Sequence, residues 1–61
     1  MKPEYIIVIE MAVLARIGEF QRYADKREAC RDEGGKAFCI RSADELKDAL
    51  EEFRAFVRVG G

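Results

Sequence analysis

Four consecutive β-branched residues near the N-terminus, Ile6 to Ile9, constrain the fold of this chain more than any other segment. Such side chains lose rotamer freedom in a helix and pack well on a pleated sheet. We therefore predict a strand over residues 4–9, and because both of its faces are apolar, we expect helices or a second subunit to bury both sides. Pro3 followed by Glu4 is also typical of the first turn of a helix, so a helical interpretation stays open.

The segment that follows predicts a helix from about Met11. Its apolar residues fall in a narrow stripe at helical spacing, namely Val13, Ile17, Phe20 and Ala24. Beyond this stripe, residues 25–33 are charged at seven of nine positions. We expect the first half of the helix to pack on the rest of the protein and the second half to project into solvent, with Gly34 and Gly35 ending it.

The next segment, Lys36–Arg41, predicts a short second strand because Phe38 and Ile40 alternate with smaller residues. Charged residues on either side are typical of an edge strand. The order up to this point is therefore strand, helix, strand.

A second helix is predicted to begin at Ser42, since Ser42-Ala43-Asp44-Glu45 matches a capping box in which the Ser42 and Glu45 side chains bond reciprocally to backbone amides. Gly60 is suited to a left-handed C-terminal cap. A split at Arg54, with a third strand over residues 55–59, is the alternative. The apolar face of the single helix comprises Leu46, Ala49, Leu50, Phe53, Phe56 and Val57.

These elements predict one small α+β (small α/β) domain over residues 1–61, with two short strands and two helices in the order β-α-β-α. Two short strands do not form an independently stable sheet. Pairing with a twofold-related copy would complete a four-stranded sheet and a shared core. We therefore expect a homodimer, with an interface at Ile7, Ile9, Phe38 and Ile40.

The side-chain inventory argues against an enzyme. The chain contains no His, Thr, Asn or Trp, one Ser and one Gln, whereas acid–base and nucleophilic catalysis depend on such groups. Cys30 and Cys39 have no His or third thiol to complete a metal site, so we expect no catalytic residues, metal or cofactor. We interpret them as free thiols of a reducing compartment, with a disulfide or redox pair as the alternative.

Charge and hydropathy exclude further classes. Eleven Lys and Arg balance twelve Asp and Glu, which removes the bulk attraction that drives binding to nucleic acid or an anionic membrane. No apolar run is long enough for a membrane span, and the N-terminus lacks the pattern of a signal peptide. We expect a cytoplasmic protein without a small-molecule substrate.

The remaining hypothesis is a small accessory protein that regulates or inhibits another protein by binding it as a homodimer. We expect the contact surface in the projecting part of the first helix, residues 22–31, where acidic residues interleave with basic ones and mixed charge suits a protein partner. A small dimeric DNA-binding regulator is the alternative. The residues expected to bind the partner are Arg22, Tyr23, Lys26, Arg27 and Arg31.

The C-terminal residues Arg58-Val59-Gly60-Gly61 resemble the end of ubiquitin-like modifiers and sulfur carriers, in which a Gly-Gly tail presents its carboxylate for adenylation. The resemblance implies a carrier function and covers only these last residues. Those families have an opening β-hairpin and lead into the tail with a strand. Here no hairpin turn is visible, and a helix is expected before the tail.

Overall fold

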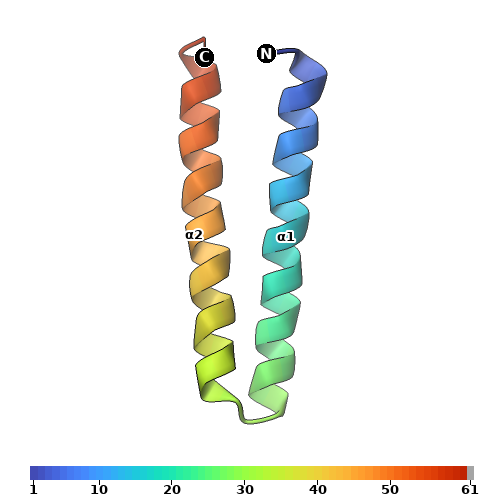
Figure 1. Cartoon of the computed structure of the whole chain (residues 1–61), viewed down its shortest axis with the longest axis vertical. Coiled ribbons are helices and arrows are strands. Elements are labelled where there is room, and N and C mark those ends of the chain that lie inside the picture. Colours follow the sequence, from blue (N-terminus) through green and yellow to red (C-terminus); the bar gives the residue numbers. More distant parts are fainter. Residues whose placement is uncertain (61) are drawn as a thin grey trace.

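The computed structural model describes residues 1–60, which form two long antiparallel helices joined by a short loop (Figure 1). Helix α1 spans Pro3–Ala29 and helix α2 spans Glu33–Arg58. The N-terminus and the end of α2 lie together at one end of the molecule, and the loop lies at the other. Residues 1–60 contain no strand, so the predicted α+β fold with two strands per chain is wrong. The protein is a helical hairpin.

The predicted strand over residues 4–9 forms the first turns of α1 instead. Pro3 occupies the start of the helix, where its missing N–H is no loss, and Glu4 lies in the first turn, where its charge suits the helix dipole. Each β-branched residue disfavours a helix by only about 0.5 kcal/mol. Within residues 1–60 a strand here would have no neighbour to pair with, whereas the helix packs its half-buried Ile6 toward α2.

The loop begins at Arg31, which adopts a left-handed conformation with φ of 59°. The Arg31 amide donates to the Glu28 carbonyl at 3.0 Å, and the Asp32 amide donates to the Arg27 carbonyl at 2.8 Å. This pair of bonds is the Schellman motif that closes many helices, here with Arg31 where glycine is usual. The first helix therefore ends at Ala29, not at Gly34 and Gly35 as predicted.

Gly34 and Gly35 begin α2. The Asp32 carboxylate accepts a hydrogen bond from the Gly35 amide at 3.0 Å and so caps the helix. A methyl group on Gly35 would lie 2.4 Å from one Asp32 carboxylate oxygen, so this cap requires glycine at position 35. Once α2 is started there, nothing interrupts it before Arg58.

Because α2 begins at Glu33, two further predictions are wrong. Lys36–Arg41 is helical, because it continues the α2 stripe that faces α1, and the predicted second strand is wrong. Ser42 lies inside α2, where the capping box with Glu45 has no helix end to cap. In contrast, the single helix through Arg54 and the left-handed cap at Gly60, with φ of 85°, are confirmed.

The two helices meet along one seam whose positions alternate steps of three and four residues, the spacing of a coiled coil. Every seam residue is buried or half-buried. The predicted stripe from Val13 to Ala24 belongs to it, as do Leu46, Leu50, Phe53 and Val57 of the second predicted stripe, whereas Ala49 and Phe56 of that stripe are exposed. The seam continues beyond both stripes toward the loop and the termini. The seam consists of Ile6, Glu10, Val13, Ile17, Phe20 and Ala24 from α1 and of Cys39, Ala43, Leu46, Leu50, Phe53 and Val57 from α2.

Two ion pairs define the register of the hairpin. Lys36 lies 3.2 Å from Glu28 near the loop, and Arg54 lies 3.5 Å from Glu10 near the termini. The two residue numbers sum to 64 in both pairs, so each α1 residue lies level with the α2 residue that completes this sum. The helices therefore keep one antiparallel register along their whole contact.

The hairpin is a single layer. Its Cα atoms extend over 45 × 17 × 9 Å, so nothing in residues 1–60 covers either broad face. Among residues 1–60, only Ile17, Ala24, Cys39, Ala43 and Leu50 are buried. Neither helix offers an apolar stretch long enough to cross a bilayer, over the residues the structure describes.

Candidate protein-binding surface

One broad face of the hairpin is rich in aromatic side chains. The Phe20 and Phe38 rings meet edge to face with centroids 6.5 Å apart, which places both on the same side of the seam. On α1, Ile9 and Tyr23 lie fourteen residues apart, which is about four turns. Tyr5 lies one turn before Ile9, and Phe20 lies one turn before Tyr23. These four residues share one flank of α1.

The same face continues on α2. Phe56 lies eighteen residues after Phe38, five full turns, and therefore occupies the same side of the helix. Phe53, half-buried in the seam, lies one turn before Phe56. All six aromatic residues of the chain, two Tyr and four Phe, thus lie on one face. We call this surface the aromatic face and define it as Tyr5, Ile9, Phe20 and Tyr23 of α1 with Phe38, Phe53 and Phe56 of α2.

Charged residues divide the aromatic face at its middle. The Arg16 guanidinium lies over the Phe20 ring, 5.0 Å from its centroid, and pairs with Glu19 at 2.6 Å. On α2, Glu45 lies seven residues after Phe38, on the same flank, and no ion pair links it to another residue within 1–60. An ion pair on α1 therefore lies beside a carboxylate on α2 that is unpaired within residues 1–60.

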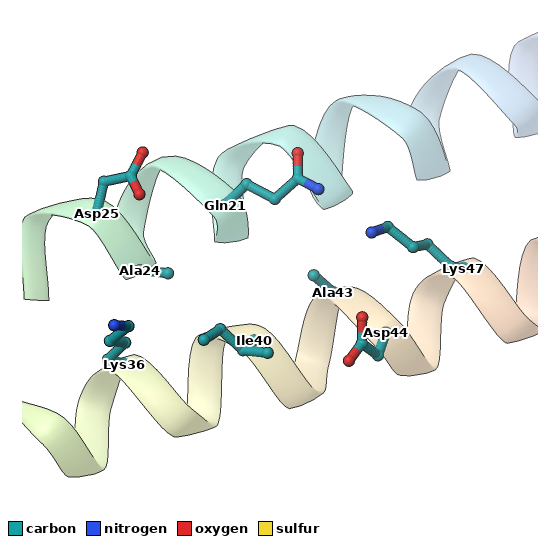
Figure 2. Close-up of a pocket in the computed structure, with 8 residues that line it drawn as sticks. All are labelled: Gln21, Ala24, Asp25, Lys36, Ile40, Ala43, Asp44 and Lys47. Atoms are coloured by element: carbon teal, nitrogen blue, oxygen red, sulfur yellow. The ribbon is translucent and has the colours of Figure 1, made fainter. Parts of the chain in front are cut away.

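The opposite face holds a hollow between the helices (Figure 2). Its volume is about 250 Å³, and it forms because Ala24 and Ala43, on the facing sides of the two helices, are too short to fill the space. Two carboxylates and two ammonium groups line it, so the hollow has no preference for an anion or a cation. Its lining residues are Gln21, Ala24, Asp25, Lys36, Ile40, Ala43, Asp44 and Lys47.

Within residues 1–60 no three potential metal ligands lie together. Cys39 is buried in the seam, and Cys30 is exposed at the C-terminal cap of α1, both as free thiols. No protein-family model matches this chain, and no curated protein or solved structure is significantly similar to it. What the geometry offers is contact area, shape and charge.

The structure brings the residues predicted to bind a partner to the loop end of α1, but not to a single face. Arg22 and Lys26 lie one turn apart on the outer side of α1, while Tyr23 belongs to the aromatic face. Arg27 is engaged with Asp32 at 3.7 Å, and Arg31 lies in the loop. All five are exposed, and partner binding at these residues stays a prediction.

The four residues predicted to form the dimer interface are also exposed, but they divide between the two faces. Ile9 and Phe38 belong to the aromatic face, whereas Ile40 lines the hollow on the opposite side and Ile7 lies on that side of α1. Pairing of strands cannot join them, because all four are helical. Dimerisation itself stays a prediction, with a different geometry.

Sequence reasoning divided the aromatic residues among the apolar stripes, the expected dimer interface (Phe38) and the expected partner surface (Tyr23), and so missed the aromatic face. The signal was present as a second set of residues at heptad spacing, offset from the seam. Ile9, Arg16 and Tyr23 follow one another at seven-residue steps on α1, and Phe38 and Glu45 do so on α2. A helix with two such stripes has two surfaces to bury.

Proposed function

We propose that this chain is a small non-catalytic protein that regulates or inhibits another protein by binding to it, and that it works as a homodimer. The observation that carries the proposal is the aromatic face, which exposes Tyr5, Tyr23, Phe38 and Phe56 on a single-layer molecule. Interfaces are enriched in aromatic residues, and clusters of exposed apolar side chains are typical of association. The lack of histidine and of activated hydroxyl groups supports binding over chemistry.

The surface proposed for the regulated partner is the loop end of α1. Arg22, Lys26 and Arg31 are exposed there, and within residues 1–60 none of them forms an ion pair. Asp25 interleaves with them, so the surface has mixed charge and suits a protein partner of complementary pattern better than a phosphate backbone. The two free thiols support a reducing compartment, and we propose the cytoplasm.

Affinity capture with paired variants tests this function. The double substitution Arg22→Glu with Lys26→Glu changes the net charge by four units on the proposed surface. We expect it to abolish capture of a stoichiometric protein partner and to leave the helix content unchanged. The matched control, Lys47→Glu with Arg58→Glu, changes the charge equally on α2 and should capture as the wild type does.

Three outcomes would contradict the proposal. Equal loss of capture in the control pair would show that total charge, not this surface, governs binding. Retention of duplex DNA, with an affinity that falls steeply as salt rises, would favour the dimeric DNA-binding regulator. A mass adduct at the C-terminus would favour the carrier, although α2 continues to Arg58, where ubiquitin-like proteins have a strand, and Gly61 lies outside the described residues.

A further inference from the structure

The hairpin exposes more surface than a compact protein of its mass. Its accessible area is 4826 Å² for 7.0 kDa. A compact monomer of this mass exposes about 4,000 Å². The difference of about 800 Å² equals the area that each partner buries in a standard-size protein interface. The radius of gyration, 14.2 Å, likewise exceeds the value of about 10.5 Å for a compact chain of this length.

The aromatic face is the surface that needs this cover. Phe38 is 62% exposed, Tyr5 55% and Phe56 54%. These side chains come from both helices and both ends of the hairpin, so a covering layer must be about as long as the hairpin and must present apolar groups at both ends. A second copy of the same face meets both requirements.

We propose that a second copy of this chain covers the aromatic face, forming a four-helix bundle whose twofold axis runs parallel to the helices. The inference rests on the homodimer of the proposed function and adds its geometry. The axis places the α1 helix of the partner subunit over α2 and the loops of both copies at the same end. Every neighbouring pair of helices is then antiparallel, as in most four-helix bundles.

Symmetry about such an axis allows no sliding, so the register of the hairpin sets which residues meet. The partner's Tyr5 lies level with position 59, directly after the end of α2 and three residues or about 4.5 Å from Phe56. The partner's Tyr23 lies level with position 41, equally close to Phe38, and the partner's Ile9 lies level with position 55, between Phe53 and Phe56. The aromatic groups at both ends of the face therefore meet at once.

Charge does not separate the two possible axes. With the parallel axis, the partner's Arg16 lies level with position 48, within about one helical turn of Glu45, and the partner's Glu19 lies level with Glu45 itself. With an axis perpendicular to the helices, matching Phe38 with the partner's Phe56 brings the two Arg16 residues within two positions of each other and the partner's Glu19 within one position of Arg16. The arrangement therefore rests on the aromatic groups that meet at both ends of the face.

The position of the loops distinguishes the two bundles. A spin label on Cys30, in a chain carrying Cys39→Ala, marks each loop, and dipolar spectroscopy measures the distance between the two labels. With the parallel axis the labelled helices lie about 10–14 Å apart, so we expect a distance below roughly 30 Å. A distance near the hairpin length of 45 Å would overturn the parallel axis and keep the homodimer.

The mass of the unlabelled native protein, measured by sedimentation, separates the two proposals. A monomer at micromolar concentration would overturn this geometry and the homodimer of the proposed function together, while leaving partner capture as an independent result. A dimer with the short label distance supports both.

Charge exchange provides a second test that does not depend on a label. Arg16→Glu alone and Glu45→Arg alone each place like charges together in the homodimer, and we expect each to raise the Kd about tenfold or more. An equimolar mixture restores both opposite-charge contacts and should dimerise as tightly as the wild type. The controls Lys47→Glu and Asp44→Arg make the same changes beside the hollow and should leave the Kd unchanged. Failure of the mixture to restore dimerisation would overturn the assignment of Arg16 and Glu45.

Discussion

The two glycines that begin α2 should respond oppositely to alanine. Nothing lies within 4 Å of a methyl group added to Gly34, so Gly34→Ala exchanges a flexible residue for a good helix former. This exchange stabilises a helix by about 0.5–1 kcal/mol. For a domain of this size, 1 kcal/mol raises the Tm by about 4–8 °C. We expect Gly34→Ala to raise the Tm by several degrees.

Gly35→Ala makes the same gain in helix propensity but loses the cap. Its methyl group would lie 2.4 Å from one oxygen and 2.9 Å from the carboxyl carbon of Asp32, so the carboxylate must move. Loss of an N-cap costs about 1 kcal/mol, and loss of the exposed pair with Arg27 at most about 1 more. We therefore expect Gly35→Ala to be neutral or destabilising by about 1 kcal/mol.

A double-mutant cycle with Asp32→Ala isolates the cause. Without the carboxylate, the methyl group at position 35 meets no close oxygen, and Gly35→Ala should become stabilising by about 0.5–1 kcal/mol. Thermal unfolding followed by circular dichroism measures all four chains at one fixed protein concentration, because dimerisation makes the Tm depend on concentration. Equal stabilisation by Gly34→Ala and Gly35→Ala in the native background would refute the capping argument.

Three other predictions concern the loop, the seam and the thiols. Arg31→Gly should stabilise the hairpin by about 1 kcal/mol, because glycine adopts the left-handed conformation of this position, with φ of 59°, without strain. An unchanged denaturation midpoint would show that this conformation of Arg31 does not strain the backbone. Leu50→Ala, at a position only 4% exposed, should cost about 2–5 kcal/mol, whereas Met11→Ala, at a position 64% exposed, should change stability by less than about 0.5 kcal/mol in denaturant titrations. An alkylating reagent should modify the exposed Cys30 in the native protein and Cys39 only in denaturant, as intact mass will show; equal native rates would place Cys39 outside the seam.

The parts of the fold that could be predicted from the sequence are those where apolar residues occupy the helix contact. The stripe from Val13 to Ala24 showed the packed half of α1 correctly, and the stripe from Leu46 to Val57 did so for α2 except at the exposed Ala49 and Phe56. The seam continues through Glu10 and through the small Cys39 and Ala43, which interrupt an apolar pattern although they face the other helix. Recognition of the whole seam required the three- and four-residue spacing itself.

The predicted helix boundaries were wrong for a different reason, because two local sequence signals favoured boundaries that the structure does not have. A glycine pair after a charged helix is typical of a helix end, but Arg31 takes the left-handed position that glycine was expected to fill. Asp32 then caps a helix that begins at the glycines. A left-handed residue that ends one helix, followed directly by a residue that caps the next, produces a helical hairpin. The glycine pair considered alone predicts only a helix end.

The candidate site was missed because the aromatic residues were divided among apolar stripes, predicted strands and the expected partner surface, and were not recognised as one face. Two helices in one layer have a single seam, and that seam already contains twelve residues, of which only Phe20 and Phe53 are aromatic. Tyr5, Tyr23, Phe38 and Phe56 therefore need a second layer that residues 1–60 do not supply. The predicted sheet is wrong, but the argument for a homodimer does not depend on it. The exposed apolar side chains still need cover, and helices present them instead of strands.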